Sequence, residues 1–113
     1  MFPHCYGRSA GYSPRCAVPY VDDAVRGHIE SCGMGQFIRH RTGHSIGREV
    51  PGVGANMDYF ETHDERPIIP WTCFSIEPAL YLADFGVRTE INLFVEEHGT
   101  RVTGKMQTEF VKL

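Results

Sequence analysis

The alternating pattern of residues 87–95 constrains the fold of this chain more than any other feature of the sequence. Apolar or β-branched residues fill one set of alternate positions, and the other set holds Arg88, Glu90, Asn92 and Phe94. Successive side chains of a β-strand point to opposite faces of a sheet. The pattern therefore predicts a strand with one face packed on a core and the other face available for chemistry.

A helix is predicted over residues 21–32. Apolar side chains recur there on one helical face, at Val21, Val25, Ile29 and Cys32. Asp22 and Asp23 favour the N-terminal end of the helix dipole, and Gly33 is a good residue to follow the C-terminal end.

Further short strands are predicted at residues 36–40, 71–76, 101–103 and 108–111. Tight turns are expected at residues 43–47 and 97–100, and a long loop, solvated for the most part, at residues 51–67. Repeated strands with a single main helix indicate an α+β domain built on a curved antiparallel sheet.

Residues 1–20 follow no period. They hold three prolines, two glycines, two cysteines and three tyrosines, which predicts an irregular N-terminal segment. The domain itself is expected to comprise residues 21–113.

Length and charge exclude several classes of function. A chain of 113 residues with a net charge of −3 forms one domain at most. It has no run of Lys and Arg, so no nucleic-acid partner is expected. No apolar stretch approaches the roughly 18 residues of a membrane span, and the N-terminus lacks the pattern of a signal peptide. We expect no membrane association and a cytoplasmic protein.

The spacing of the four cysteines also favours a cytoplasmic location of the protein. None forms a Cys-x-x-Cys pair, so a structural zinc site is not expected. We interpret all four as free thiols in a reducing compartment, at Cys5, Cys16, Cys32 and Cys73.

Three metal-capable side chains, His44, Glu77 and Glu90, lie in apolar or glycine-bounded segments. The neighbours of Glu77 predict partial burial, and an unpaired buried carboxylate costs several kcal/mol. Either a metal ion or a salt bridge with Arg88 would remove that cost. A structural histidine and a solvated strand face are the alternative explanations for His44 and Glu90. One imidazole with two carboxylates suits Mn, Co, Fe or Zn.

From about residue 21 to residue 104 the chain resembles the C-terminal part of the pita-bread metallopeptidases. This family contains methionine aminopeptidase, Xaa-Pro aminopeptidase, prolidase and creatinase. The resemblance rests on residues 40–47 (HRTGHSIG), 75–78 (SIEP) and 85–90 (FGVRTE), in that order. The first motif leans toward the Xaa-Pro branch. The resemblance implies part of a pita-bread fold and a peptide substrate with proline at its second position.

The resemblance also implies a role for each matching residue. His44, Glu77 and Glu90 would be ligands of a site that holds two divalent ions in the family, with Glu90 bridging them. A water molecule activated by the metal would attack the peptide carbonyl, and Glu77 would carry a proton to the leaving amine. His40 would contact substrate, and Arg88 would orient the carboxylates.

The chain departs from the family pattern in two ways. The family has two further ligands, aspartates on a strand well before the histidine motif, and residues 1–20 contain no Asp. The family also has a histidine seven residues after the ligand histidine, where this chain has Pro51. Proline cannot stabilise a tetrahedral intermediate through its side chain. We expect one bound ion or none, and weak or absent activity of this chain alone.

Two further expectations follow from these departures. The chain is either a truncated Xaa-Pro-type peptidase domain or a non-catalytic pita-bread scaffold that serves as a binding module. In the family the fold is a duplicated half, so a lone half would expose apolar surface. A homodimer or a tendency to aggregate is therefore expected.

Overall fold

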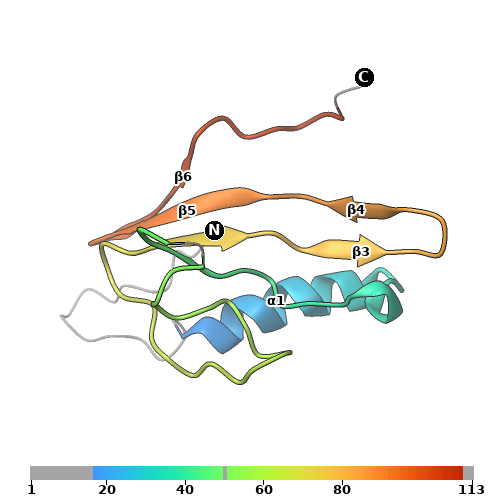
Figure 1. The fold of residues 1–113 in the computed structure, drawn as a ribbon, viewed down its shortest axis with the longest axis horizontal. Helices are drawn as coiled ribbons and strands as arrows, with labels where there is room; N and C mark the ends of the chain where they lie inside the picture. The colour runs from blue at the N-terminus through green and yellow to red at the C-terminus, as the bar shows by residue number, and fades with distance from the viewer. Residues whose placement is uncertain (1–16, 50, 111–113) are drawn as a thin grey trace.

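The structure of the chain, a computed structural model, describes residues 17–49 and 51–110. Within these residues one α-helix lies along one side of antiparallel strands, as Figure 1 shows. The predicted α+β class with an antiparallel sheet and one main helix is thereby confirmed. The predictions for residues 1–16 and 111–113 lie outside the described residues.

Helix α1 (Val18–Ser31) confirms the predicted helix but begins earlier. Pro19 lies in its first turn, where the missing N–H is not needed. Gly33 follows the end of the helix with φ of 74°, a left-handed conformation that glycine adopts without strain. Residues 18–20 are helical, so the prediction that they are irregular is wrong. The side chain of Val18 extends the apolar stripe of the helix and is buried.

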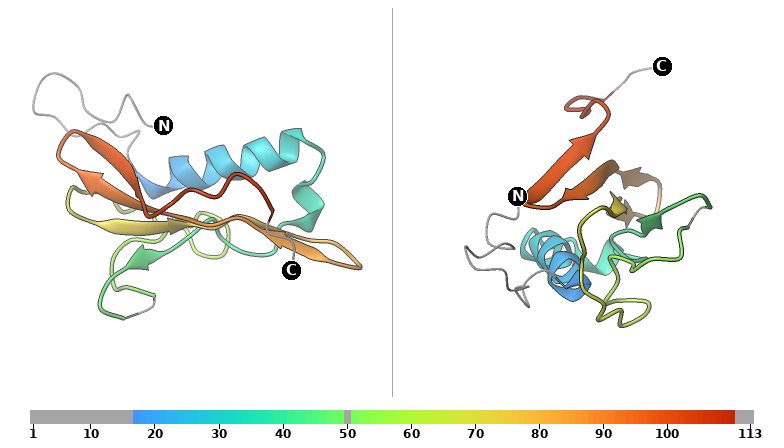
Figure 2. Two further views of the ribbon diagram at one scale, coloured as in Figure 1. Left: turned by 90° about the horizontal axis from the view of Figure 1, so that it is seen from above. Right: turned by 90° about the vertical axis from the view of Figure 1, so that its left-hand side faces the viewer.

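The main sheet has four antiparallel strands in the order β1-β2-β5-β6. They are β1 (Ser45–Ile46), β2 (Cys73–Ile76), β5 (Ile91–Glu96) and β6 (Gly99–Thr103). Two more strands, β3 (Ala79–Tyr81) and β4 (Gly86–Arg88), pair with each other. In the right-hand view of Figure 2, α1 and the C-terminal segment after β6 lie on opposite sides of the strands. One sheet face therefore meets the helix and the other meets that segment.

The single strand predicted at residues 87–95 is divided. Thr89 and Glu90 separate β4 from β5, so the alternation continues across two strands. Leu93 and Val95 are buried on the helix side, whereas Glu90 is exposed. The prediction of one apolar and one polar face is confirmed for β5. The returning strand predicted at residues 101–103 is confirmed within β6.

Other strand predictions are wrong. Residues 36–40 overlap the 3₁₀ turn η2 (Gly35–Phe37) and form no strand. The Ile38 N–H donates to the Gly35 carbonyl at 3.2 Å, so the chain turns here instead of extending. Residues 108–110 are irregular. The turn predicted at residues 43–47 contains β1.

The core lies between α1 and the helix side of the sheet. Its buried apolar residues are Val18, Val21, Met57, Phe74 and Val95. Met57 comes from the long loop 51–67, where Asp58 and Asp64 are buried as well. The prediction of a solvated loop is wrong for these three residues, because the loop folds inward against the helix.

No helix in the described parts of the chain is long and apolar enough to cross a membrane. Cys32 and Cys73 are free thiols. Cys5 and Cys16 lie outside the described residues.

Trp71 occupies an unfavourable backbone conformation just before β2. Its φ is 65°, although it is not glycine, and the left-handed region costs a side-chain-bearing residue roughly 1–2 kcal/mol. Its N–H donates to the Val95 carbonyl at 2.7 Å, which holds the backbone in place. The side chain is 67% exposed, so little burial compensates for the strain.

We predict that Trp71→Gly will be more stable than Trp71→Ala by about 1 kcal/mol, because only glycine relieves the left-handed strain. Both variants remove the same contacts of the ring with Phe94, so the alanine variant is the matched control. Urea unfolding of the two proteins measures the difference. Equal stability would show that the backbone at this position is not strained.

Candidate active site

Two glutamates face each other where one long β-hairpin is interrupted. The hairpin runs from β2 into β3 and returns through β4 into β5, and its pairing has one register on both sides of the gap, with partners Ile76–Ile91 and Ala79–Arg88. The same register carried across the gap places Glu77 opposite Glu90. Residues opposite each other in an antiparallel pair share a face of the sheet.

Pro78 explains the gap in the hairpin. Proline has no N–H to donate to a strand ladder, and across the gap the Thr89 N–H donates to the Pro78 carbonyl at 3.2 Å. Like charges directly opposite each other in a sheet are destabilising. The pair Glu77 and Glu90 therefore favours a cation at this point.

His44 reaches Glu77 through backbone contacts between β1 and β2. The His44 N–H donates to Ser75 Oγ at 3.0 Å, and the Ser75 N–H donates to the His44 carbonyl at 2.9 Å. A Cβ atom on Gly43 would overlap the Ser75 carbonyl, so glycine is required for this approach. The imidazole Nε2 then lies 3.1 Å from Glu77 Oε1.

The hydrogen bonds of His44 determine which nitrogen carries hydrogen. Nδ1 lies 2.8 Å from the Ser45 carbonyl, and because a carbonyl only accepts, Nδ1 must donate. In the neutral imidazole, Nε2 then presents a lone pair toward the Glu77 carboxylate. Two acceptors at this distance need a cation between them, either a proton on Nε2 or a metal ion.

His44 and Glu77 fit a divalent ion. Mn, Co, Fe and Zn accept imidazole and carboxylate ligands, and a bond from Nδ1–H to a carbonyl orients the ring as in metal-ligating histidines. Over residues 17–49 and 51–110, no group of three or more His, Cys, Asp or Glu side chains is gathered tightly enough to hold an ion. Glu90, the third predicted ligand, has an exposed side chain.

A polar chain joins the other predicted site residues to Glu77. Arg88 Nη1 lies 3.4 Å from Glu77 Oε2, and Arg88 Nη2 donates to the Tyr81 hydroxyl at 3.1 Å. His40 Nδ1 donates to the Arg41 carbonyl at 2.7 Å, so its Nε2 accepts from the Tyr81 hydroxyl at 3.0 Å. The hydrogen bond to Tyr81, and then the charges of Glu77 and Glu90, raise the pKa of Arg88 above its ordinary value.

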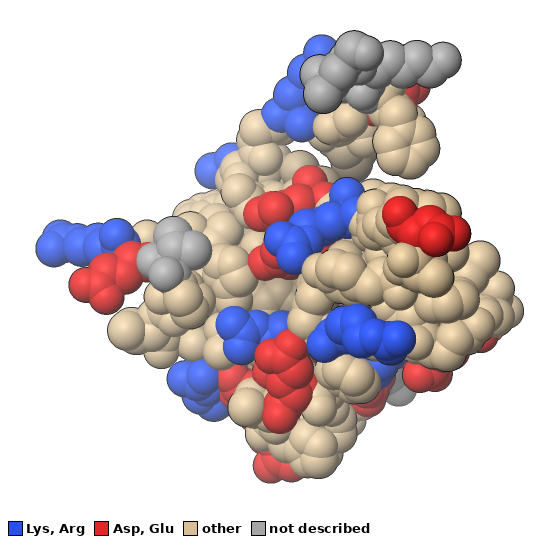
Figure 3. All heavy atoms as spheres, turned by 45° about the vertical axis from the view of Figure 1, so that its right-hand side comes forward, with Lys and Arg blue, Asp and Glu red and all other residues tan. Residues whose placement is uncertain are grey.

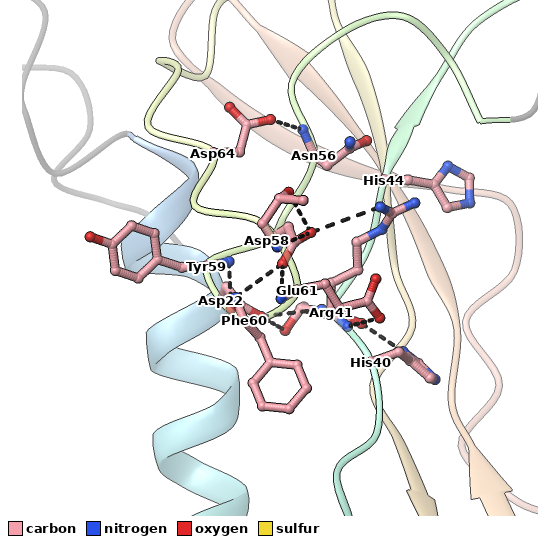
Figure 4. Close-up of polar contacts among 12 residues, drawn as sticks. Asp22, His40, Arg41, His44, Asn56, Asp58, Tyr59, Phe60, Glu61 and Asp64 are labelled. Carbon is pink, nitrogen blue, oxygen red and sulfur yellow. Dashed lines mark hydrogen bonds and ion pairs between the residues drawn. The ribbon is translucent and has the colours of Figure 1, made fainter.

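A buried aspartate of α1 anchors the histidine motif (Figure 4). Asp22 is 1% exposed and accepts hydrogen bonds from the Thr42 hydroxyl at 2.6 Å and the Tyr59 N–H at 2.8 Å. Arg26, one turn later, lies 3.1 Å from it. Thr42 in turn accepts the Glu77 N–H through its carbonyl at 2.7 Å. The helix therefore positions the loop before His44 and the residue that faces it.

A second buried aspartate shapes the long loop. Asp58 is 0% exposed and accepts the N–H groups of Phe60, Glu61 and Thr62. Burial alone would raise the pKa of Asp58, but these hydrogen bonds and the Thr62 hydroxyl lower it below its ordinary value. Arg41 of the histidine motif lies 3.8 Å from this carboxylate. Asp58 thus holds the loop and is not free to act on a ligand.

The structure brings four of the five predicted site residues into one connected group: His40, His44, Glu77 and Arg88. Glu90 lies opposite Glu77 in register but makes no direct ion pair with the group. Sequence reasoning missed Tyr81, Ser75 and Asp22. Only Asp22 left a signal, because it lies on the apolar side of α1 together with Val18 and Val25.

Comparison with protein families gives a match to metallopeptidase family M24 over residues 10–97. An Xaa-Pro dipeptidase of Lactobacillus delbrueckii is 35% identical over 68% of this chain and 20% of its own length. A probable dipeptidase PepE of Mycobacterium bovis is 33% identical over 76% of this chain and 22% of its own. The chain thus spans about a quarter or less of these relatives.

Solved structures agree in fold. The prolidase of Thermococcus sibiricus matches with a TM-score of 0.76 and 28% identity, over 86% of this chain and 26% of that one. An X-Pro aminopeptidase of Thermotoga maritima matches with a TM-score of 0.69 and 30% identity, over 76% and 24%. The predicted pita-bread relationship is confirmed.

The loop beside His44 also depends on Asp64. Arg66 donates to this carboxylate from Nε at 2.9 Å and from Nη2 at 2.6 Å, and the Asn56 N–H donates at 2.8 Å. The bond from Arg66 is the main reason that the pKa of Asp64 falls from 3.8 to about 2, although burial opposes the shift. Asn56 Oδ1 accepts the N–H of Ser45 at 3.3 Å, next to His44.

We predict that Asp64→Asn will lower the free energy of unfolding by about 1 kcal/mol at pH 6, a value reduced for the exposed guanidinium of Arg66. Because the folded-state pKa lies below the unfolded one, the stabilisation is present above pH 4 and is lost as the pH falls toward 2. Urea unfolding between pH 6 and pH 2 measures this, with Glu65→Gln as the control. Parallel pH profiles of wild type and Asp64→Asn would contradict the assignment.

Proposed function

Because the chain belongs to metallopeptidase family M24, we propose that it is the part of a metal-dependent peptidase that cleaves the bond between an N-terminal residue and proline. The contact of His44 with Glu77 carries this proposal, since it pairs a metal-competent imidazole with a carboxylate at 3.1 Å. Curated relatives named Xaa-Pro dipeptidase support the substrate class.

In this proposal His44, Glu77 and Glu90 hold a divalent ion, Mn, Co, Fe or Zn. When bound, such an ion supplies an activated water molecule near neutral pH. The like charges of Glu77 and Glu90, opposite each other across the hairpin gap, support a cation site, because a cation removes their repulsion.

The remaining residues position Glu77 and the substrate. Ser75 donates to Glu77 Oε1 at 2.9 Å, and Arg88 faces Oε2 at 3.4 Å, so each carboxylate oxygen has a fixed partner. Glu77 is thereby placed to carry a proton to the leaving amine. His40, joined to Arg88 through Tyr81, is the proposed substrate contact.

We propose that the chain alone is a slow catalyst or a binding module. It spans about a quarter or less of the relatives described above. Pro51, which is exposed, offers no hydrogen-bond donor to a tetrahedral intermediate. The chain also has large exposed apolar side chains, such as Val53, which is 96% exposed, and Trp71, which is 67% exposed. These side chains support self-association as a homodimer.

We predict that the wild-type chain with excess Mn hydrolyses Ala-Pro slowly, and that His44→Ala lowers the rate at least about tenfold because it removes a metal ligand. His28→Ala is the matched control, since this histidine is exposed on α1. Release of proline measures the rate. Turnover that survives His44→Ala would contradict the site, and metal binding with no turnover would favour the non-catalytic module.

We predict that Glu77→Gln combined with Glu90→Gln abolishes Mn uptake by the chain, because two anionic ligands are lost. Glu97→Gln, at an exposed position in the turn between β5 and β6, should bind Mn like wild type. Isothermal titration calorimetry measures the uptake. Equal uptake by all three proteins would remove the ligand assignment.

A further inference from the structure

A pocket of about 520 Å³ lies at the β1 edge of the main sheet, outside the candidate active site. None of the five predicted site residues lines it. Its walls come from β1, from the turn at residues 52–55 and from the segment 66–74 that leads into β2. The volume falls within the roughly 300–1,000 Å³ that is typical of small-molecule sites. The pocket is therefore large enough for a ligand of its own.

The walls of this pocket are mainly apolar. Val53, Ile69, Trp71 and Phe74 line it, and the first three of these side chains are exposed. Exposed apolar side chains that gather around a hollow mark ligand-binding grooves, whereas scattered ones need no explanation. The body of a ligand that enters this pocket is therefore apolar.

The charge in the pocket wall is already matched. Among the described residues that line the pocket, only Arg66 carries a charge. Its guanidinium donates to Asp64 at 2.6 and 2.9 Å and to the Gly54 carbonyl at 3.2 Å. Acidic and basic side chains also lie next to each other on the face shown in Figure 3, so no field of one sign dominates there. The pocket therefore favours a neutral ligand, because a buried charge needs a partner.

One buried hydroxyl in the pocket wall has no hydrogen-bond partner. Ser45 is 5% exposed, and its Oγ bonds to none of the described residues. The main chain of Ser45 is satisfied, because its N–H donates to Asn56 Oδ1 at 3.3 Å and its carbonyl accepts the Gly52 N–H at 2.8 Å. A buried hydroxyl without a partner is unfavourable. A ligand group that bonds to Ser45 Oγ would remove this cost.

Two glycines lie directly against this hydroxyl. A Cβ atom on Gly52 would stand 3.0 Å from Ser45 Oγ, and a Cβ atom on Gly54 would stand 3.4 Å from it. Because neither residue has a side chain, a small displacement of this turn is enough to bring a ligand group to Oγ.

We propose that this pocket binds a small neutral molecule with an apolar body and one hydroxyl group, which bonds to Ser45 Oγ. The body contacts Ile69, Trp71 and Phe74. Two hydroxyls can each donate or accept, so the bond forms with either one as the donor. This site is separate from the proposed peptidase site and needs no metal.

The test compares p-cresol with toluene, which lacks only the hydroxyl, on the full chain in EDTA and at low protein concentration. Trp71 is the only tryptophan of the chain and lines the pocket, so its fluorescence, excited beyond the absorption of p-cresol, measures binding. Both probes should change this fluorescence in a saturable way. The ratio of the toluene to the p-cresol dissociation constant should fall about fivefold in Ser45→Ala, as expected for one lost hydrogen bond.

Two further variants separate the pocket from the rest of the surface. Ile69→Ala should weaken both probes alike, because it removes part of the apolar wall. Phe85→Ala, at an exposed apolar residue between β3 and β4 and outside the pocket, should change neither. Urea unfolding checks that Ser45→Ala is folded, and its midpoint should equal or exceed that of wild type, since an unpaired hydroxyl is removed.

Three results would overturn the inference: no saturable change in Trp71 fluorescence with either probe, an unchanged ratio of dissociation constants in Ser45→Ala, or an Ile69→Ala variant that binds both probes like wild type. None of these measurements involves a metal ion or peptide hydrolysis. Failure here is therefore separate from failure of the proposed function, which the His44→Ala comparison tests in the presence of Mn.

Discussion

The repulsion between two carboxylates on neighbouring strands is the constraint around which the rest of this structure is arranged. A continuous hairpin register places Glu77 opposite Glu90, and three other side chains contact the Glu77 carboxylate. His44 Nε2 lies next to Glu77 Oε1, to which the Ser75 hydroxyl also donates, and Arg88 lies next to Oε2. A site of this kind is polar by necessity, and it sits on the sheet face that α1 leaves uncovered.

The opposite side of the sheet serves this arrangement through one buried aspartate. Asp22 joins the helix to Thr42 and Tyr59, and the carbonyl of Thr42 accepts the N–H of Glu77. A buried carboxylate is tolerated when donors surround it, and here the donors come from three separate segments. The core and the site are therefore not independent. Asp22, buried between the helix and the loop, holds Thr42, and Thr42 holds the backbone of Glu77.

The sequence predicted the elements whose patterns are local. The helix follows from its apolar stripe, and β5 from its alternation at Leu93 and Val95. The division at Thr89 was not predictable from that alternation, because the cause, Pro78, lies on the partner strand. The salt bridge of Arg88 with Glu77, one of the two explanations offered for that glutamate, is observed. Tyr81 contacts the site only because β3 pairs with β4. This pairing is non-local, so the spacing of residues along the chain did not predict it.

Gly43 has a consequence for how well the site keeps its shape. The main chain at Gly43, just before β1, approaches Ser75 so closely that no side chain fits between them. The Gly43 N–H and carbonyl are both hydrogen-bonded to the main chain of Met57. The gap between imidazole and carboxylate is thus fixed by two polypeptide backbones in direct contact. Side-chain substitutions on the outer loops should therefore change this separation little, because main-chain atoms set the approach of the two segments.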